Sequence, residues 1–374
     1  MHIALVVPGG VDRSGEYRVI PALLALLARL SRTDEVEVFA LAQEAAPADW
    51  RLAGAQIHNV GMRRSRLRAL RAILARHRAR RFDLVQSIWS GSCGLVAVGA
   101  ATLLRIPSLV HVAGGELVAL PEIGYGGMLR TRSRVRERLT LRAASAVTAA
   151  SAPLIAALAG LGVRAQRVPL GVDLREWPSR PPRPRAAGAR AQLIHVASLN
   201  RVKDQGTLLR ALAALLRAGV DFHLEIIGED TLAGEIHALA AELGLAARVT
   251  FRGFLPQRQL RPLIEAADLM IVSSRHEAGP LVTLEAAVAG VPTVGTAVGH
   301  IAEWAPEAAI AVPVADPAAL ASAVGAVLAD EELRLRIARQ AWQRATLEDA
   351  DHTARTFQAL YAKLAGTASD CHRV

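Results

Sequence analysis

Residues 273–303 read SSRHEAGPLVTLEAAVAGVPTVGTAVGHIAE, and this stretch predicts a loop, a helix and a strand. The apolar run 269–272 just before it has the composition and length of a buried strand. A helix is expected from about Leu281, because Gly290 ends the run and Pro292 follows closely. Strand, loop, helix and strand in this order are typical of an open α/β sheet, which binds ligands at the carboxyl ends of its strands.

Two glutamates in this unit have a spacing that suits a sugar nucleotide. Glu277 falls in the loop after the first strand, and Glu285 falls in the early turns of the helix. One carboxylate can accept hydrogen bonds from sugar hydroxyls and the other from a ribose, while the amides of Gly279, Leu281 and Val282 suit a phosphate. The alternative is that both glutamates are solvated surface residues, as most glutamates are.

The pattern E-AGPLVTLEAAVAGVP-VG--VGHIAE resembles the E-x7-E region of the family 4 retaining glycosyltransferases. The resemblance implies an α/β protein of the GT-B fold, with two Rossmann-like domains facing each other across a cleft and a C-terminal helix that crosses back to the first domain. It also implies transfer of a sugar, with retention, from a nucleotide-sugar donor to an acceptor hydroxyl, without a metal or other cofactor. The donor-binding residues implied here are Glu277, Ala278, Gly279, Pro280, Leu281, Val282 and Glu285.

Other donor-binding residues are expected in loops that follow predicted strands. Gly9 and Gly10 follow strand 2–7, and in the resembled family such a pair faces the donor phosphate. Lys203 matches the family's diphosphate-binding lysine, but Ser198 stands where the family has an arginine. Arg201 could supply the missing charge, and Gly228 ends strand 223–228. Lys203 and Glu277, with His111, are the residues expected to take part in catalysis.

The acceptor side is expected at the loop after strand 108–112, where Gly114, Gly115 and Glu116 lie. The family has a histidine just before this glycine pair, and this chain has Ala113 instead. His111 falls on the same face of the strand, since side chains alternate along a strand, so it could substitute in part. The alternative is a buried histidine with a structural hydrogen bond.

Length and composition favour two domains in a reducing compartment. A chain of 374 residues is long for one core. We expect an acceptor-side domain at 1–172, a proline-rich linker at 173–190, a nucleotide-sugar-binding domain at 191–345 and a returning helix at 346–374. The two cysteines form no disulfide framework, which favours the cytoplasm. The uncharged run 143–163 is long enough to span a bilayer, but its small residues, serines and Pro153 favour a strand and a helix.

The charge is unevenly distributed along the chain. Residues 1–175 contain 24 arginines and 12 acidic residues, whereas residues 176–374 contain 20 basic and 22 acidic residues. The excess positive charge is concentrated at 63–81 and 130–142, which favours binding to an anionic surface such as a membrane. The expected acceptor is a lipid-linked sugar at such a membrane or another glycan. Solvated helix faces in an arginine-rich chain are the alternative. Nucleic acid is not expected, because aromatic residues are scarce and no nucleic-acid motif is present.

Two other functions remain open from the sequence. The departures at Ser198 and Ala113 are compatible with a degenerate, non-catalytic protein that binds sugar nucleotides. A sugar-nucleotide epimerase of the same fold is the second alternative. A dehydrogenase is less favoured, because the first loop lacks the G-x-G-x-x-G pattern. The sequence does not identify the sugar, the base or the acceptor.

Overall fold

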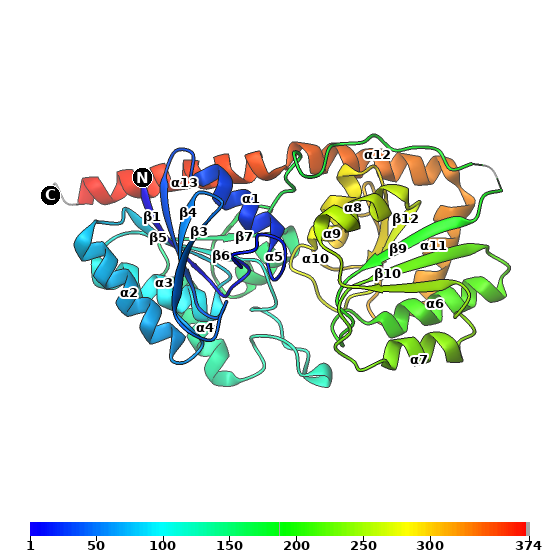
Figure 1. The fold of residues 1–374 in the computed structure, drawn as a ribbon, viewed down its shortest axis with the longest axis horizontal. Helices are drawn as coiled ribbons and strands as arrows, with labels where there is room; N and C mark the ends of the chain where they lie inside the picture. The colour runs from blue at the N-terminus through cyan, green and yellow to red at the C-terminus, as the bar shows by residue number, and fades with distance from the viewer. Residues whose placement is uncertain (187, 372–374) are drawn as a thin grey trace. The chain divides into compact units, whose positions relative to one another are not determined.

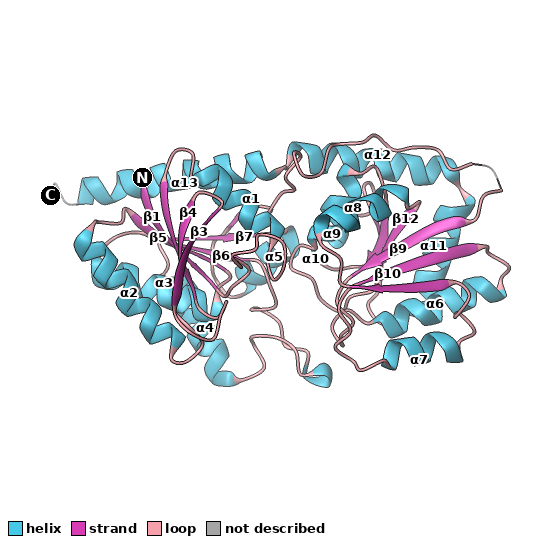
Figure 2. Ribbon diagram, viewed as in Figure 1, coloured by secondary structure: helices cyan, strands magenta, loops and turns pink. Residues whose placement is uncertain are grey.

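The computed structural model describes residues 1–186 and 188–371. The chain divides into two compact units, one made of residues 1–173 and 350–374 and the other of residues 174–349. Residues 174–190, the greater part of the expected linker, are therefore counted with the second unit. Each unit has a sheet with helices on both of its faces (Figure 1, Figure 2).

The first unit is built on an eight-stranded sheet in the order β3-β4-β2-β1-β5-β6-β7-β8. All neighbouring strands are parallel except β3 and β4, which form an antiparallel pair. The strands are β1 (His2–Val7), β2 (Glu35–Ala40), β3 (Ala48–Leu52), β4 (Ala55–Asn59), β5 (Leu84–Ile88), β6 (Ser108–Val112), β7 (Ala146–Ala149) and β8 (Gln166–Arg167). Chain order reverses between β1 and β5, which is the position where such sheets bind ligands.

Alternation along the strands determines what each face of this sheet buries. Ala4, Val6 and Val85 point toward one face and join a core with helices α2 and α3. The other face receives the last helix, whose Tyr361 hydroxyl donates to Gln86 on β5. The helices of this unit are α1 (Pro21–Leu30), α2 (Ser65–Ala79), α3 (Gly91–Leu104), η1 (Pro121–Ile123), α4 (Thr131–Ala143), α5 (Ala152–Gly160) and α13 (Ala350–Cys371).

The second unit is built on six parallel strands in the order β11-β10-β9-β12-β13-β14. This order is that of a dinucleotide-binding Rossmann sheet, with the reversal between β9 and β12. Its strands are β9 (Ala191–Val196), β10 (Phe222–Ile227), β11 (Val249–Gly253), β12 (Leu269–Val272), β13 (Thr293–Thr296) and β14 (Ile310–Val312). Its helices are α6 (Gln205–Arg217), α7 (Glu235–Glu242), α8 (Gln257–Ala266), α9 (Leu281–Val288), α10 (Gly299–Trp304), α11 (Pro317–Ala329) and α12 (Glu331–Leu347).

The last two helices, α12 and α13, belong to different units. Helix α12 packs on α9 in the second unit, and α13 packs on α1 in the first. The Ala350 amide donates to the Val172 carbonyl, which ties the start of α13 to the first unit. The last helix therefore returns to the first unit, as the resemblance implied.

The hairpin of β3 and β4 was not expected from the sequence. Its turn is Ala53 and Gly54, both with positive φ angles of 50° and 83°, a pairing that suits a tight two-residue turn. The segment 143–163 forms β7 and α5 with their connections, as expected. In the described part of the chain, no helix combines the length and apolar character needed to cross a bilayer.

Candidate functional site

The candidate donor site lies at the strand-order reversal of the second sheet. The loop 197–204 follows β9 and leads into α6, while the loop 273–280 follows β12 and leads into α9. Because β9 and β12 are parallel neighbours, both loops leave the same edge of the sheet. Lys203 and Glu277 are thereby brought together from positions 74 residues apart.

The side chains of Lys203 and Glu277 form an ion pair, with Lys203 Nζ 2.6 Å from Glu277 Oε1. The Ser274 hydroxyl donates to the same oxygen at 2.7 Å. Glu277 Oε2 has no hydrogen bond to any residue that the structure describes. The carboxylate is thus fixed through one oxygen, and the other is available to accept from a ligand hydroxyl.

Further contacts connect the two loops and fix their geometry. The Ser273 hydroxyl donates to the Lys203 carbonyl at 2.8 Å, and the Arg275 amide donates to the Val202 carbonyl at 2.7 Å. Arg275 also pairs through its side chain with Asp204 at 3.1 Å. With four connections between the loops, the position of Lys203 relative to Glu277 does not depend on their ion pair alone.

Residues of β13 and α10 also contact the loop that carries Glu277. Gly299 has a φ of +49°, and a Cβ there would lie 2.8 Å from Pro280 Cδ and 3.1 Å from the Glu277 carbonyl oxygen. Thr296 donates its hydroxyl to the Ser274 carbonyl. A side chain at position 299 would therefore displace the loop, which explains the glycine at this position.

A buried histidine supports the pair from the strand beneath it. His195 Nδ1 lies 2.9 Å from the Ile271 carbonyl on β12, so this nitrogen carries the proton. Nε2 then accepts from the Gln205 side chain at 3.2 Å. Burial, with a contribution from Lys203, lowers the pKa of His195 to about 4. The ring is neutral at physiological pH and joins two strands rather than carrying charge.

The N-terminus of α9 has no side-chain cap. Pro280 occupies the N-cap position, and its side chain forms no capping hydrogen bond. The first amides of a helix have no partner within the helix and point outward with the positive end of its dipole. The loop 273–280, which carries Glu277, leads directly into this N-terminus, and Lys203 contacts Glu277 from the neighbouring loop 197–204. Gly279, Leu281 and Val282 are half-buried and Ala278 is buried.

Glu285 lies about one turn after Leu281, the first residue of α9, and is only 6% exposed. Its Oε1 accepts from Gln257 Nε2 on α8 at 3.0 Å, and Gln257 in turn accepts from the Trp177 indole at 2.9 Å. Burial raises the pKa of Glu285 to about 7, although the hydrogen bond from Gln257 opposes the rise. The sequence did not indicate this burial or the Gln257 partner.

The other expected donor residues of the second unit differ in placement. The Arg201 guanidinium binds both oxygens of Glu235 at 2.7 Å, at an exposed position. Its charge is engaged with Glu235 of α7, and its expected part in binding the diphosphate stays a prediction. Ser198 is exposed, and its carbonyl accepts from Gln205 at 3.1 Å. Gly228 has φ +153°, and a Cβ there would overlap the Ala197 carbonyl. Gly228 thus allows two ligand-side loops to approach closely.

In the first unit, Gly9 and Gly10 begin the loop after β1. Gly10 has φ +80°, and a Cβ there would lie 2.5 Å from Ile20 Cδ1. The Val11 amide donates to the Gln43 side chain at 3.0 Å. These contacts fix the loop locally, and the part expected for Gly9 and Gly10 in donor binding stays a prediction.

His111 lies inside the first unit rather than in a loop. It is fully buried on β6, its ring meets Phe357 of α13 edge-on at 5.4 Å, and its Nδ1 lies 2.9 Å from the Thr148 hydroxyl. Burial lowers the pKa of His111 to about 3. This placement fits the structural alternative, because α13 covers the face of the sheet toward which His111 points.

The expected acceptor loop carries a buried carboxylate. Glu116 Oε1 accepts from the Ser90 amide at 3.0 Å, and burial together with nearby Glu137 raises the pKa of Glu116. Glu137 on α4 accepts from the Gly91 amide at 3.1 Å. Both acids therefore cap the N-terminus of α3. The contacts of Gly115 with Tyr125 and of Gly114 with Trp89 leave little room for a Cβ.

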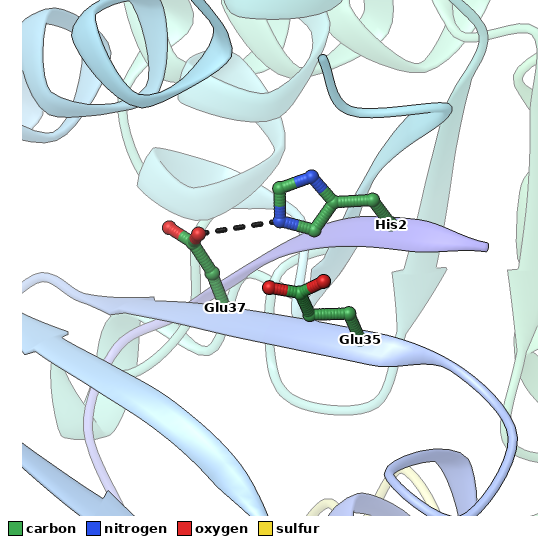
Figure 3. Close-up of side chains that lie close together, drawn as sticks. All are labelled: His2, Glu35 and Glu37. Carbon is green, nitrogen blue, oxygen red and sulfur yellow. Dashed lines mark hydrogen bonds and ion pairs between the residues drawn. The ribbon is translucent and has the colours of Figure 1, made fainter. Parts of the chain in front are cut away.

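One group of possible metal ligands in the described part of the chain is His2, Glu35 and Glu37 (Figure 3). Glu37 already accepts two hydrogen bonds from Arg76 and one from His58. Burial opposes ionisation, but these donors hold the pKa of Glu37 at about 2. The group lies on β1 and β2, outside the unit that contains Glu277, and its charges are balanced by protein groups. We therefore assign it a structural role.

Comparisons with known proteins agree with this architecture. Residues 18–171 match the model of the glycosyl transferase 4-like domain, and residues 181–344 match the model of glycosyl transferases group 1. Both units are glycosyltransferase domains of the GT-B fold. Each match falls within one of the two units.

One similar curated protein is the GDP-mannose-dependent alpha-(1-6)-phosphatidylinositol dimannoside mannosyltransferase of Mycobacterium tuberculosis. It is 33% identical over 193 residues, covering 48% of this chain and 49% of the relative. The chain spans about half the length of the curated relatives that it matches first.

Two solved structures show the same fold. Sucrose-phosphate synthase from Thermosynechococcus elongatus has a TM-score of 0.80 and 19% identity, covering 98% of this chain and 100% of that one. Anabaena HepE in complex with UDP-glucose has a TM-score of 0.74 and 20% identity, covering 97% of this chain and 100% of that one. At this level of identity, the likeness concerns the fold.

Proposed function

We propose that this glycosyltransferase moves a sugar from a nucleotide-sugar donor to an acceptor hydroxyl with retention at the anomeric carbon. The observation that carries the proposal is the pairing of Lys203 with Glu277 beside the uncapped N-terminus of α9. A cation and free amides suit a diphosphate, and a carboxylate with one available oxygen suits a sugar hydroxyl.

The leaving diphosphate gains negative charge as the glycosidic bond breaks, so groups that bind it lower the barrier. Lys203 and the amides of Gly279, Leu281 and Val282 would supply this stabilisation. In the structure Lys203 is held by Glu277 at 2.6 Å, and a bound diphosphate would compete for the same ammonium group. Donor binding would then weaken the ion pair and leave more of the Glu277 carboxylate for the sugar.

Glu277 would orient the sugar, and Glu285 would bind the ribose. Glu277 Oε2 is the oxygen available for a hydroxyl. Glu285 is buried but retains a second oxygen beside the one that Gln257 binds. Retention would then need no enzyme nucleophile, because the departing phosphate can take the acceptor's proton on the same face. The placement of His111 in the core is compatible with this route.

The acceptor side is proposed to be the loop with Gly114, Gly115 and Glu116, and the acceptor to be a glycan or a lipid-linked sugar. The +12 charge of residues 1–175 supports an acceptor held at an anionic membrane surface. A mannosyltransferase named for a phosphatidylinositol dimannoside is among the relatives. We propose that the protein acts in the cytoplasm, peripherally at the inner face of the membrane.

The test is incubation of the purified protein with UDP-, GDP- and ADP-sugars, with and without candidate acceptors. Transfer predicts release of a nucleoside diphosphate and a product with the donor's anomeric configuration, read by proton NMR. Stabilisation by a donor without turnover would instead favour the non-catalytic sugar-nucleotide-binding protein, which the exposed Ser198 and the engaged Arg201 also motivate. An epimerised donor would favour the isomerase.

A further inference from the structure

A groove of about 610 Å³ runs between α3 and α4 in the first unit, and its lining is almost entirely apolar. Leu95 and Val98 line it from α3, while Val135 and Leu139 line it from α4. Val135 is 55% exposed and Leu139 is 63% exposed. Leu103, which is also 63% exposed, continues the face of α3 that carries Leu95 and Gly99 at four-residue intervals. Large aliphatic side chains are thus exposed together rather than singly.

The apolar surface is bordered by cations. Helix α4 carries Arg132, Arg134, Arg136, Arg138 and Arg142. Its one acidic residue, Glu137, is 4% exposed and points inward to the Gly91 amide. None of these five arginines pairs with a carboxylate among the residues whose side chains the structure describes. The exposed charges of α4 are therefore all positive.

Two of these arginines line the groove itself, Arg132 and Arg136. Arg136 Nε is buried and has no hydrogen-bond partner in the described part of the chain. A buried guanidinium N–H without an acceptor is costly unless a ligand supplies one. The groove therefore combines an apolar lining with a donor that still requires an oxygen acceptor, such as a phosphate.

Helix α3 packs on both α2 and α4 (Figure 1), and arginines are also concentrated at the start of α2. Met62, just before α2, and Leu67, in its first turn, are 63% and 43% exposed, and Arg63, Arg64, Arg66 and Arg68 lie among them in the sequence. Exposed aliphatic residues accompanied by arginines thus occur on both helices that pack on α3.

We propose that the α3–α4 face, defined as Leu95, Leu103, Arg132, Val135, Arg136 and Leu139, docks on an anionic phospholipid bilayer with Val135 and Leu139 inserted among the acyl chains. Aliphatic side chains at the centre with arginines around them are the features of a helix that lies in a membrane interface. A surface that binds another protein would be expected to have fewer charged residues and more aromatic residues at its centre.

This inference rests on the proposed function, which places the acceptor at a membrane, and it goes further by naming the surface and the mode of binding. Charge alone would give attachment that high salt reverses completely. Insertion of Val135 and Leu139 adds a contribution that salt does not screen, since burial of apolar surface is not an interaction between charges. Salt resistance therefore separates the two modes.

The first experiment is co-sedimentation of the full chain with vesicles of phosphatidylcholine alone or mixed equally with phosphatidylglycerol, at low and high salt. We expect binding to the anionic vesicles, with a fraction that survives high salt. The double variant Val135→Gln, Leu139→Gln should reduce partitioning roughly tenfold and remove the salt-resistant fraction. Leu347→Gln is the matched control, because Leu347 is 74% exposed on α12 of the other unit.

The second experiment reports insertion directly. In a Cys371→Ser background, Leu139→Cys and Leu347→Cys are each labelled with an environment-sensitive dye, since Cys93 is buried and burial raises the pKa of its thiol. The emission of the Leu139→Cys protein should shift to the blue on anionic vesicles, and that of the Leu347→Cys protein should not. Equal shifts at both positions, or none at position 139, would overturn the proposal.

Sedimentation without lipid gives a further decisive outcome. If the wild-type chain self-associates and the Val135→Gln, Leu139→Gln variant does not, the face is an interface between copies and the membrane proposal is wrong. Donor hydrolysis measured without vesicles tests the proposed function separately. The two proposals can therefore fail independently, because vesicle binding requires no turnover and hydrolysis requires no vesicle.

Discussion

Both sheets have a reversal of strand order with a helix N-terminus beside it. The two N-termini differ in the side chains that contact their amides. In the second unit, α9 begins at Leu281 without a side-chain cap, next to Lys203. In the first unit, the amides of Ser90 and Gly91 at the start of α3 are bound by Glu116 and Glu137. One unit leaves the positive end of a helix open to an anion, and the other fills the same place with its own carboxylates.

Under the proposed function, this difference favours binding of the donor diphosphate at α9 of the second unit. A diphosphate brought to α3 would meet two acidic groups, and at α9 it would meet a lysine and unpaired amides. The topology gives both units a ligand edge, but the side chains determine which ligand each edge can bind. The following predictions test whether this contrast is functional, beginning with the largest expected effect.

Removing the charge of Lys203 should have the largest effect. Lys203→Gln should lower turnover by roughly 10²- to 10³-fold, because the leaving diphosphate loses its cation. Lys203→Arg should keep part of the activity, since an arginine retains the charge with a different geometry. The measurement is steady-state release of nucleoside diphosphate. An equal loss in both variants would indicate that shape rather than charge matters here.

Glu277→Ala should lower turnover by roughly 10²-fold, about 3 kcal/mol of transition-state stabilisation, if its free oxygen orients the sugar. The fold should survive, because Ser273, Arg275 and Thr296 also connect the loops. Thermal unfolding in the absence of donor is the control. Wild-type turnover in a folded variant would show that Glu277 does not orient the sugar.

Glu285→Gln should change stability in a way that depends on pH. The folded-state pKa of Glu285 is about 7, above its ordinary value of 4.5. Between these values the folded protein binds more protons than the unfolded one, so stability falls as the pH rises through this window. The glutamine variant escapes this loss and should be more stable than wild type at pH ~8, by up to about 3 kcal/mol, but not at pH ~4.

The check is denaturant unfolding of both proteins at the two pH values without ligand. A constant difference would show that the pKa of Glu285 is the same in the folded and unfolded states. Nucleotide affinity measured on the same samples tests the ribose assignment, because the glutamine should bind the donor more weakly even where it is more stable.

Removing a carboxylate from the N-terminus of α3 should have the smallest effect. Glu137→Gln weakens the cap on the Gly91 amide and should cost about 1 kcal/mol of stability, in the range of other helix caps. The KM for the donor should not change, because the contrast places the diphosphate at α9. A change in donor affinity together with a normal fold would show that the N-terminus of α3 takes part in the donor site.

The parts of the fold that could be predicted are those with local signals. The strand at 269–272 and the helix from Leu281 were both expected with these bounds, because an apolar run, Gly290 and Pro292 lie close together in the sequence. The hairpin of β3 and β4 was missed because its strands are short and its turn contains Ala53 rather than Asn or Asp.

The parts of the site that could not be predicted depend on long-range partners. Nothing near Arg201 in the sequence indicates that Glu235 binds it, and nothing near Glu285 indicates Gln257. Ser274 and Arg275 could have been suspected, because they lie in the same loop as Glu277. The orientation of His111 was decided by α13, which begins more than 200 residues later and covers that face of the sheet.

The return of α13 to the first unit also has a consequence for biosynthesis. Phe357 and Tyr361 contact His111 and Gln86, so these two residues of the first sheet lack their partners while residues 174–349 are being made. The second unit, by contrast, is continuous in the chain and contains all the residues of its own core. Domains tend to fold in the order in which they leave the ribosome. Here the unit whose synthesis begins first is the one that can be completed only last.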